Sequence, residues 1–171
     1  CWLVQTEDYA EAQELFRPDY AYFSSTSASW LAHASQYAEK ITEQLQLTPD
    51  SLVIEVASND GYLLKNFLSA GIPCLGIEPT AGTAAVPDIN DFTQGLKAAL
   101  KPGGTITLEF PHLMQLVERN QFDTVYHEHF SYLTLYTVAR IFEAAGLRVI
   151  DVEELPTHGG SLRVYGCHFE D

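Results

Sequence analysis

Long apolar runs and paired cysteines are both absent from this chain of 171 residues. No stretch reaches the ~18–20 apolar residues that a membrane-spanning helix needs, and the first residues lack the basic-then-apolar pattern of a secretory leader. Cys1, Cys74 and Cys167 stand too far apart in the sequence to indicate a disulfide framework. We therefore expect a protein of the reducing cytoplasm that has no membrane partner.

Basic residues are also scarce, since 9 Lys and Arg stand against 23 Asp and Glu, for a formal net charge of −14. Such an acidic surface argues against nucleic acid and anionic membranes as partners. It does not exclude a small anionic ligand, because backbone N–H groups can build an anion site on an acidic protein. We expect a small-molecule substrate and a chain that is monomeric or homodimeric.

What the sequence does contain is an alternation of predicted strands and helices. An apolar, β-branched run at 51–57 predicts a buried strand, and a tight turn, a helix ending at Gly71 and a second strand at 72–77 follow it. Further helices are expected at 29–47, 88–100 and 135–145, and further strands at 105–110, 147–152 and 162–168. The β–turn–α–β unit predicts an α/β fold with a Rossmann-like, doubly wound, mostly parallel sheet.

One interval is too short for that fold. Only nine residues, 79–87, separate the second strand of this unit from the next helix. A doubly wound sheet needs further strands there, because the neighbour of the first strand comes from the other half of the fold. We expect that an internal segment is missing near residues 84–86. The alternative is a protein without those strands, which would leave a hole beside the central strand.

The first strand-to-helix turn, at residues 55–61, stands where doubly wound folds bind their ligands. Gly61 and the small Ala57 and Ser58 permit close approach of a nucleotide-like cofactor to the backbone. Glu78, at the end of the next strand, can accept hydrogen bonds from ribose hydroxyls. The turn has one glycine where the pyrophosphate motif has three, so it favours S-adenosylmethionine over a dinucleotide. The alternative is a stable turn without a ligand.

The densest group of chemically active side chains is Tyr126, His127, Glu128 and His129. Histidine titrates near neutral pH and an adjacent carboxylate can orient it, so this group favours general acid–base catalysis. A metal site is less favoured, because two histidines on one face of an extended segment are too few ligands and lack the spacing of the helical zinc motif. A purely structural, hydrogen-bonded cluster stays open as a third interpretation.

Seven motifs, in order along nearly the whole chain, resemble the nucleotide-sugar C-methyltransferases of deoxysugar biosynthesis. They are Asp19–Ser25, Val56–Tyr62, Gly76–Pro79, Val86–Asn90, Leu108–His112, Tyr126–Phe130 and His158–Arg163. The resemblance implies the Rossmann-like class I methyltransferase fold and S-adenosylmethionine as cofactor. The residues that it places at the cofactor are Glu55, Ala57, Ser58, Asn59, Gly61, Tyr62, Glu78 and Pro79.

That family has three parts: a small zinc-binding domain, a central methyltransferase domain and a C-terminal Rossmann-like domain. Residues 1–28 resemble the tail of the zinc domain and a lead-in loop, with Cys1 as its last zinc ligand, and 29–171 resemble the methyltransferase domain. The other zinc cysteines are not in this chain, so no metal is expected within it. The family also has an active-site strand just before the Val86 motif, and its absence here agrees with the missing internal segment.

The resemblance also implies a mechanism and gives the residues their roles. A ketone acidifies the neighbouring sugar proton, a base removes that proton, and the enolate carbon takes the methyl group. His129 is the expected base, Glu128 orients it, and Tyr126 donates a hydrogen bond to the enolate oxygen. Tyr20 and Tyr22 are expected to close over the site, Tyr22 on the catalytic side and Tyr20 on the substrate side. The other substrate-binding residues are expected to be Phe110, His112 and Arg163, with Arg163 on the sugar diphosphate.

Two alternatives remain. An oxidoreductase that uses NAD(P) has a similar sheet, although the single-glycine turn speaks against it. A methyltransferase remnant without catalysis would keep the fold alone. For Arg163, the alternative to phosphate binding is an ordinary arginine on a strand surface.

Overall fold

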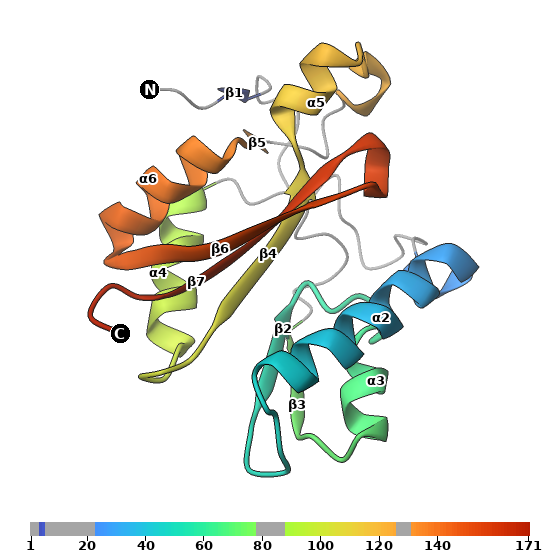
Figure 1. Cartoon of the computed structure of the whole chain (residues 1–171), viewed down its shortest axis with the longest axis vertical. Helices are drawn as coiled ribbons and strands as arrows, with labels where there is room; N and C mark the ends of the chain where they lie inside the picture. The colour runs from blue at the N-terminus through green and yellow to red at the C-terminus, as the bar shows by residue number, and fades with distance from the viewer. Residues whose placement is uncertain (1–3, 6–22, 78–87, 126–130) are drawn as a thin grey trace. The chain divides into compact units, whose positions relative to one another are not determined.

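The computed structural model describes residues 4–5, 23–77, 88–125 and 131–171 (Figure 1). The chain divides into two compact units. One comprises Ala10–Ala84, and the other comprises Cys1–Tyr9 together with Ala85–Asp171. The expected boundary near residue 28 stays a prediction, because residues 6–22 lie outside the described part of the chain.

The unit around Ala10–Ala84 contains the predicted β–turn–α–β arrangement. Its elements are the 3-10 turn η1 (Ser24–Thr26), helix α2 (Ala28–Gln44), strand β2 (Val53–Val56), helix α3 (Leu64–Ser69) and strand β3 (Cys74–Ile77). The Ser27 hydroxyl caps α2 by accepting a hydrogen bond from the Trp30 N–H at 3.3 Å. β2 and β3 pair in parallel, which puts Glu55 opposite Gly76.

One face of this two-stranded sheet is covered and the other is open. Helix α3 packs on both strands and α2 packs on α3, around Phe67 and Ile72, which are 2% exposed. On the opposite face Ile54, Leu75 and Ile77 are 38–49% exposed. Parallel sheets normally have both faces covered. The internal segment expected near residues 84–86 stays a prediction, because residues 78–87 lie outside the described part of the chain.

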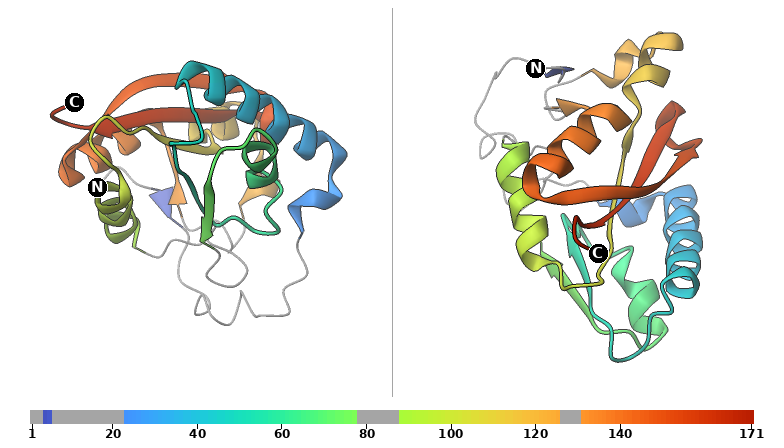
Figure 2. Two further views of the ribbon diagram at one scale, coloured as in Figure 1. Left: turned by 90° about the horizontal axis from the view of Figure 1, so that it is seen from below. Right: turned by 60° about the vertical axis from the view of Figure 1, so that its left-hand side comes forward.

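The second unit is a three-stranded sheet covered by two helices. Its elements are β1 (Val4–Gln5), α4 (Ile89–Ala99), β4 (Ile106–Pro111), α5 (Leu113–Glu118), η2 (Phe122–Thr124), β5 (Ser131–Tyr132), α6 (Leu135–Ala145), β6 (Leu147–Leu155), η3 (Thr157–Gly159) and β7 (Ser161–His168). The sheet order is β4-β7-β6, with α4 beside α6 (Figures 1 and 2). Its core includes Val138, Phe142, Leu147 and Val164, each at most 2% exposed.

Both strand pairs of this sheet are antiparallel. β7 pairs antiparallel with both β4 and β6, so those two strands run the same way and β7 is reversed between them. β1 and β5 form a separate antiparallel pair. The predicted helices and strands of this unit are all present, with α4 and α6 matching the expected ranges to within a residue. Among the described residues no helix is long and apolar enough to cross a membrane.

Candidate functional site

The turn after β2 has an unusual backbone. Ala57 and Asn59 have φ values of +64° and +49°, and Gly61 has +75°. Left-handed conformations are uncommon for residues with a side chain, and they cluster at functional sites. The Ala57 N–H extends the β2–β3 ladder by donating to the Ile77 carbonyl at 2.8 Å, and the Gly61 N–H closes the turn on the Ser58 carbonyl at 2.9 Å. The turn is therefore held in a fixed, strained shape at the carboxyl end of the strand.

Two side chains of this turn hold the lead-in to α2. Asn59 Oδ1 accepts a hydrogen bond from the Ser24 N–H at 3.0 Å, and Asp60 Oδ2 accepts one from the Ser25 N–H at 3.2 Å. Burial acts to raise the pKa of the Asp60 carboxyl, but hydrogen bonds from Ser25 and from the backbone outweigh it and lower that pKa. The sequence prediction included Asn59 and missed Asp60, although the adjacent pair of short polar side chains was the available signal.

Gly76 allows β3 to lie against this turn. A Cβ at Gly76 would stand 2.7 Å from Ser58 Oγ and 3.1 Å from Leu64 Cδ1. Ser58 itself is 6% exposed, so it has little room to retreat. Glycine at this position therefore sets the separation between the turn and the next strand.

We expect Gly76→Ala to displace Ser58 and to weaken S-adenosylhomocysteine binding by about tenfold, as measured by calorimetric titration. The matched control is Gly95→Ala on α4, where an added Cβ meets no heavy atom within 4 Å. That change should leave the Kd unaltered and stabilise the helix by about 0.5–1 kcal/mol. An unchanged Kd for Gly76→Ala would show that the turn does not bind the cofactor.

The pKa of the Cys74 thiol depends on its burial and on the neighbouring carboxylate of Glu55. Burial and the negative charge of Glu55 both raise the pKa of Cys74 above its ordinary value. Cys74 also donates to the Ile72 carbonyl at 3.2 Å. A raised pKa and this hydrogen bond both disfavour the thiolate, so the described surroundings do not activate Cys74 as a nucleophile.

The ring of Tyr62, which follows the turn in the sequence, lies near the aromatic ring of Trp30 in α2. Tyr62 is half-buried, and its ring centroid is 6.2 Å from that of Trp30, which stacks on His33 at 5.0 Å. The Asn66 amide donates to the Tyr62 carbonyl at 3.2 Å and fixes the backbone at this point. Tyr62 thus has a defined place directly after the strained turn, and its expected role at the cofactor stays a prediction.

In the other unit, Phe110 and His112 lie at the carboxyl end of β4. Phe110 pairs with Leu162 of β7, and the His112 N–H donates to the Gly160 carbonyl at 2.9 Å. Beyond His112 the chain enters α5, and the Leu113 N–H donates to the Leu133 carbonyl at 3.1 Å. Both residues therefore stand at a strand end joined to the segment that follows the Tyr126–Phe130 motif.

Arg163 is placed differently from the expectation of a guanidinium that faces a diphosphate. Its side chain is 5% exposed, and its Nη2 lies 2.7 Å from Glu109 Oε2 while its Nη1 lies 3.3 Å from Glu153 Oε2. The Arg163 Nε also donates to Glu109 Oε2 at 3.2 Å, and the Thr157 hydroxyl donates to Glu109 Oε1 at 3.2 Å. The guanidinium thus joins β4, β7 and β6. This geometry favours a structural role over phosphate binding.

Several predicted residues lie outside the described residues, so their placement stays a prediction. They are Cys1, Tyr20, Tyr22, Glu78, Pro79, Tyr126, Glu128 and His129. Within the described ranges no group of three or more His, Cys, Asp or Glu side chains is arranged to hold a metal ion.

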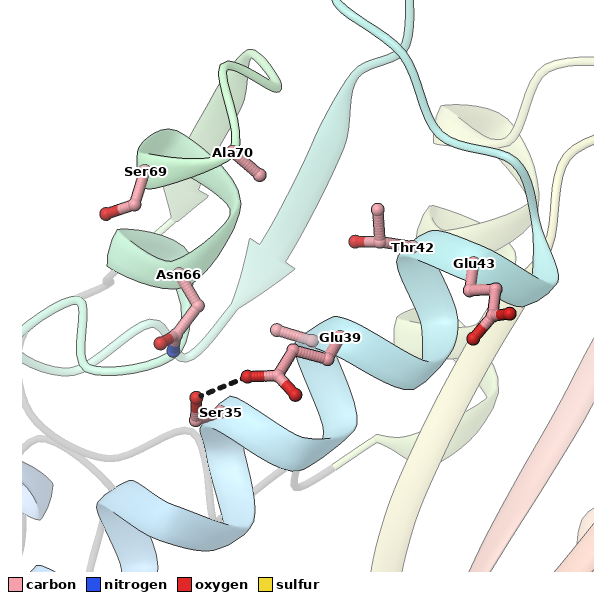
Figure 3. A pocket seen from close by; sticks show the side chains of 8 residues that line it. Ser35, Glu39, Thr42, Glu43, Asn66, Ser69 and Ala70 are labelled. Carbon is pink, nitrogen blue, oxygen red and sulfur yellow. Dashed lines mark hydrogen bonds between the residues drawn. The ribbon is translucent and has the colours of Figure 1, made fainter.

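A groove of about 520 Å³ lies between α2 and α3 (Figure 3). Ser35, Glu39, Asn66 and Ser69 are among its lining residues, and the Ser35 hydroxyl lies 3.3 Å from Glu39 Oε1. None of the residues predicted to bind cofactor or substrate lines it. It is open and lined by polar side chains and alanines, and we assign it no part in the site.

No protein-family model matches the chain. The C-methyltransferase NovU of Streptomyces niveus is 32% identical over 207 residues, which cover 98% of this chain and 49% of NovU. The chain therefore spans about half the length of this curated relative. Since 98% of 171 residues is about 168, the matched region of NovU is roughly 39 residues longer than the matched part of this chain.

Three solved structures share the fold. The Burkholderia thailandensis 1,6-didemethyltoxoflavin-N1-methyltransferase, solved with S-adenosylhomocysteine, is 12% identical, with a TM-score of 0.66 over 97% of this chain and 94% of that one. The mitomycin 7-O-methyltransferase MmcR is 13% identical, with a TM-score of 0.54 over 84% and 55% of the two chains. TnmH is 17% identical, with a TM-score of 0.53 over 81% and 56%. This chain has the α/β, Rossmann-like fold of the class I methyltransferases.

Proposed function

We propose that this chain is the catalytic part of an S-adenosylmethionine-dependent C-methyltransferase that acts on a keto-deoxysugar nucleotide. The observation that carries the proposal is the strained turn at residues 57–61, which stands at the carboxyl end of β2 in a fold of methyltransferase type. The 32% identity to a C-methyltransferase supports transfer to carbon. The sugar nucleotide rests on the seven sequence motifs, and the oxidoreductase alternative has no comparable support.

The described residues fit this cofactor. Gly61 has φ +75°, and a Cβ there would meet no heavy atom within 4 Å, so its backbone stands open to a ligand. Ala57 and Ser58 add small side chains to the same turn. Glu78, the residue after β3, is proposed to hold the ribose hydroxyls. S-adenosylmethionine, when bound, supplies an electrophilic methyl group on a positively charged sulfur.

The chain's own residues carry the proton chemistry of the proposal. His129 takes the proton from the carbon next to the ketone, holds it as imidazolium and later releases it to water. Glu128 keeps the imidazole in the orientation and tautomer for that transfer. Tyr126 donates a hydrogen bond to the enolate oxygen, where the negative charge develops. The carbon's electron pair forms the new carbon–carbon bond, and the broken carbon–sulfur bond leaves a neutral thioether.

Tyr20 and Tyr22 are proposed to exclude water from the reacting carbon. The described structure offers one support for this, because Ser24 and Ser25, just after them in the chain, are hydrogen-bonded to Asn59 and Asp60 of the turn. The lead-in is therefore anchored where the cofactor is proposed to lie. Water exclusion protects the enolate from reprotonation before methyl transfer.

The test is incubation with methyl-¹³C-labelled S-adenosylmethionine and a nucleotide-linked 4-keto-6-deoxyhexose, followed by NMR of the product. The proposal expects a new methyl signal that couples to a sugar carbon, at the position next to the ketone. A label on oxygen or nitrogen would overturn transfer to carbon. Cofactor binding with no transfer to any keto-sugar would overturn the substrate class.

A further inference from the structure

Two buried polar atoms, one just beyond β4 and one in β5, have no hydrogen-bond partner in the part of the chain that the structure describes. They are His112 Nδ1 and Ser131 Oγ, both shielded from solvent in residues that are otherwise half-buried. A buried donor or acceptor without a partner destabilises the folded protein, and natural structures keep few of them. Such atoms therefore call for an explanation, and a ligand that completes their hydrogen bonds is one.

The strand register places both side chains on one face. His112 and Leu133 form a parallel bridge, and the chain is extended from β4 to His112 and from Ser131 to Leu133. Since side chains alternate along an extended chain, Ser131 and Leu133 share a face with Phe110 and His112. Ser131 stands two residues before Leu133, so it is level with Phe110 and diagonal to His112.

That diagonal spacing suits one bridging group. A two-residue offset along the strands and one step across them put the two Cα atoms about 8 Å apart. At that spacing aromatic and long side chains still reach a diagonal neighbour, and the imidazole of His112 is such a side chain.

The hydrogen-bonding chemistry of these two atoms limits which chemical groups of a ligand they can bind. A hydroxyl can donate and accept, and an imidazole nitrogen does one or the other depending on its tautomer. A hydroxyl and an imidazole suit a carbonyl or hydroxyl oxygen better than a phosphate, which calls for guanidinium or ammonium partners. Ser131 also follows the Tyr126–Phe130 motif directly in the sequence.

We propose that Ser131 Oγ and His112 Nδ1 together bind one carbonyl or hydroxyl oxygen of the methyl acceptor. This inference rests on the proposed function and adds Ser131 to the substrate-binding residues. The pair positions the acceptor, and the proton transfer remains with His129.

The first test needs no substrate. Because Ser131 Oγ has no protein partner among the described residues, Ser131→Ala should leave the Tm unchanged or raise it. The matched control is Ser161→Ala, since Ser161 is 2% exposed and its hydroxyl donates to the Thr157 carbonyl at 3.0 Å. That change should lower the Tm by about 2–4 °C. A fall of the same size for Ser131→Ala would overturn the proposal, because it would show a structural partner.

The second test uses the nucleotide-linked 4-keto-6-deoxyhexose under initial-rate conditions. Ser131→Ala and His112→Leu should each raise KM for the sugar about five- to tenfold, while kcat and the Kd for S-adenosylhomocysteine change less than twofold. Ser131→Thr and His112→Asn keep a polar atom near the same place and should restore most of the affinity. Unchanged KM values would overturn the pair. A wild-type chain that methylates no sugar would overturn both the proposed function and the sugar as the ligand of this pair. The Tm of Ser131→Ala would still show whether the Ser131 hydroxyl has a structural partner.

Discussion

Replacing His129 with alanine is expected to lower kcat for methyl transfer by about 10²–10⁴-fold, which is the usual contribution of a positioned general base. The physical reason is that no other group in the proposed site removes the proton next to the ketone. The Kd for S-adenosylhomocysteine should change less than twofold, because His129 is assigned to the acceptor and not to the cofactor. Single-turnover kinetics with labelled methyl donor separate the chemical step from binding.

The control for this prediction is the neighbouring histidine of the same motif. His127→Ala also removes an imidazole, two residues before His129 in the sequence. The proposed mechanism assigns no proton transfer to His127. We expect its kcat to stay within about threefold of the wild-type value. Equal losses for the two variants would contradict the assignment of His129 and would favour a structural or metal-binding role for the whole cluster.

Arg163→Met is expected to lower the free energy of unfolding by about 2–4 kcal/mol, as measured by urea denaturation. The guanidinium is 5% exposed and forms ion pairs with two carboxylates, Glu109 and Glu153, which are 22% and 23% exposed. Its removal leaves both partly buried carboxylates without the cation that pairs with them. The loss is below that of a fully buried pair, because water still reaches the carboxylates.

A second arginine provides the matched control. Arg140 forms an ion pair of 2.8 Å with Glu143, and both side chains are more than 60% exposed. Arg140→Met should cost less than about 1 kcal/mol, because exposed pairs contribute little. If Arg163→Met were as mild as this control and instead raised KM for the sugar nucleotide, Arg163 would bind phosphate as the sequence motif implies.

Local patterns predicted the elements of the unit around Ala10–Ala84 well. The strand at 53–56, the glycine that ends α3 and the reversal into β3 all follow from residues close together in sequence. The same is true of α6, which Thr134 caps and Gly146 terminates at φ +75°. Hydrophobic periodicity and turn residues determine such features, and both can be read from one segment at a time.

Contacts between distant residues were not predictable in the same way. Arg163 and Glu109 are 54 residues apart, and Ser25 and Asp60 are 35 apart. Nothing in either local sequence indicates its partner. β7 lies between β4 and β6, and the pattern of apolar residues within each strand does not indicate which strands are neighbours. The phosphate role expected for Arg163 came from its residue type, and its burial between two carboxylates was visible only in the structure.

The central claim is that the turn after β2 binds S-adenosylmethionine and not a dinucleotide. Calorimetric titration with S-adenosylhomocysteine and, separately, with NADH tests it most directly. We expect micromolar binding of S-adenosylhomocysteine alone, weakened at least tenfold, or about 1.4 kcal/mol, by Glu78→Ala. Binding of NADH alone would contradict the claim and favour the oxidoreductase, and binding of neither ligand would favour a remnant that keeps the methyltransferase fold without its cofactor.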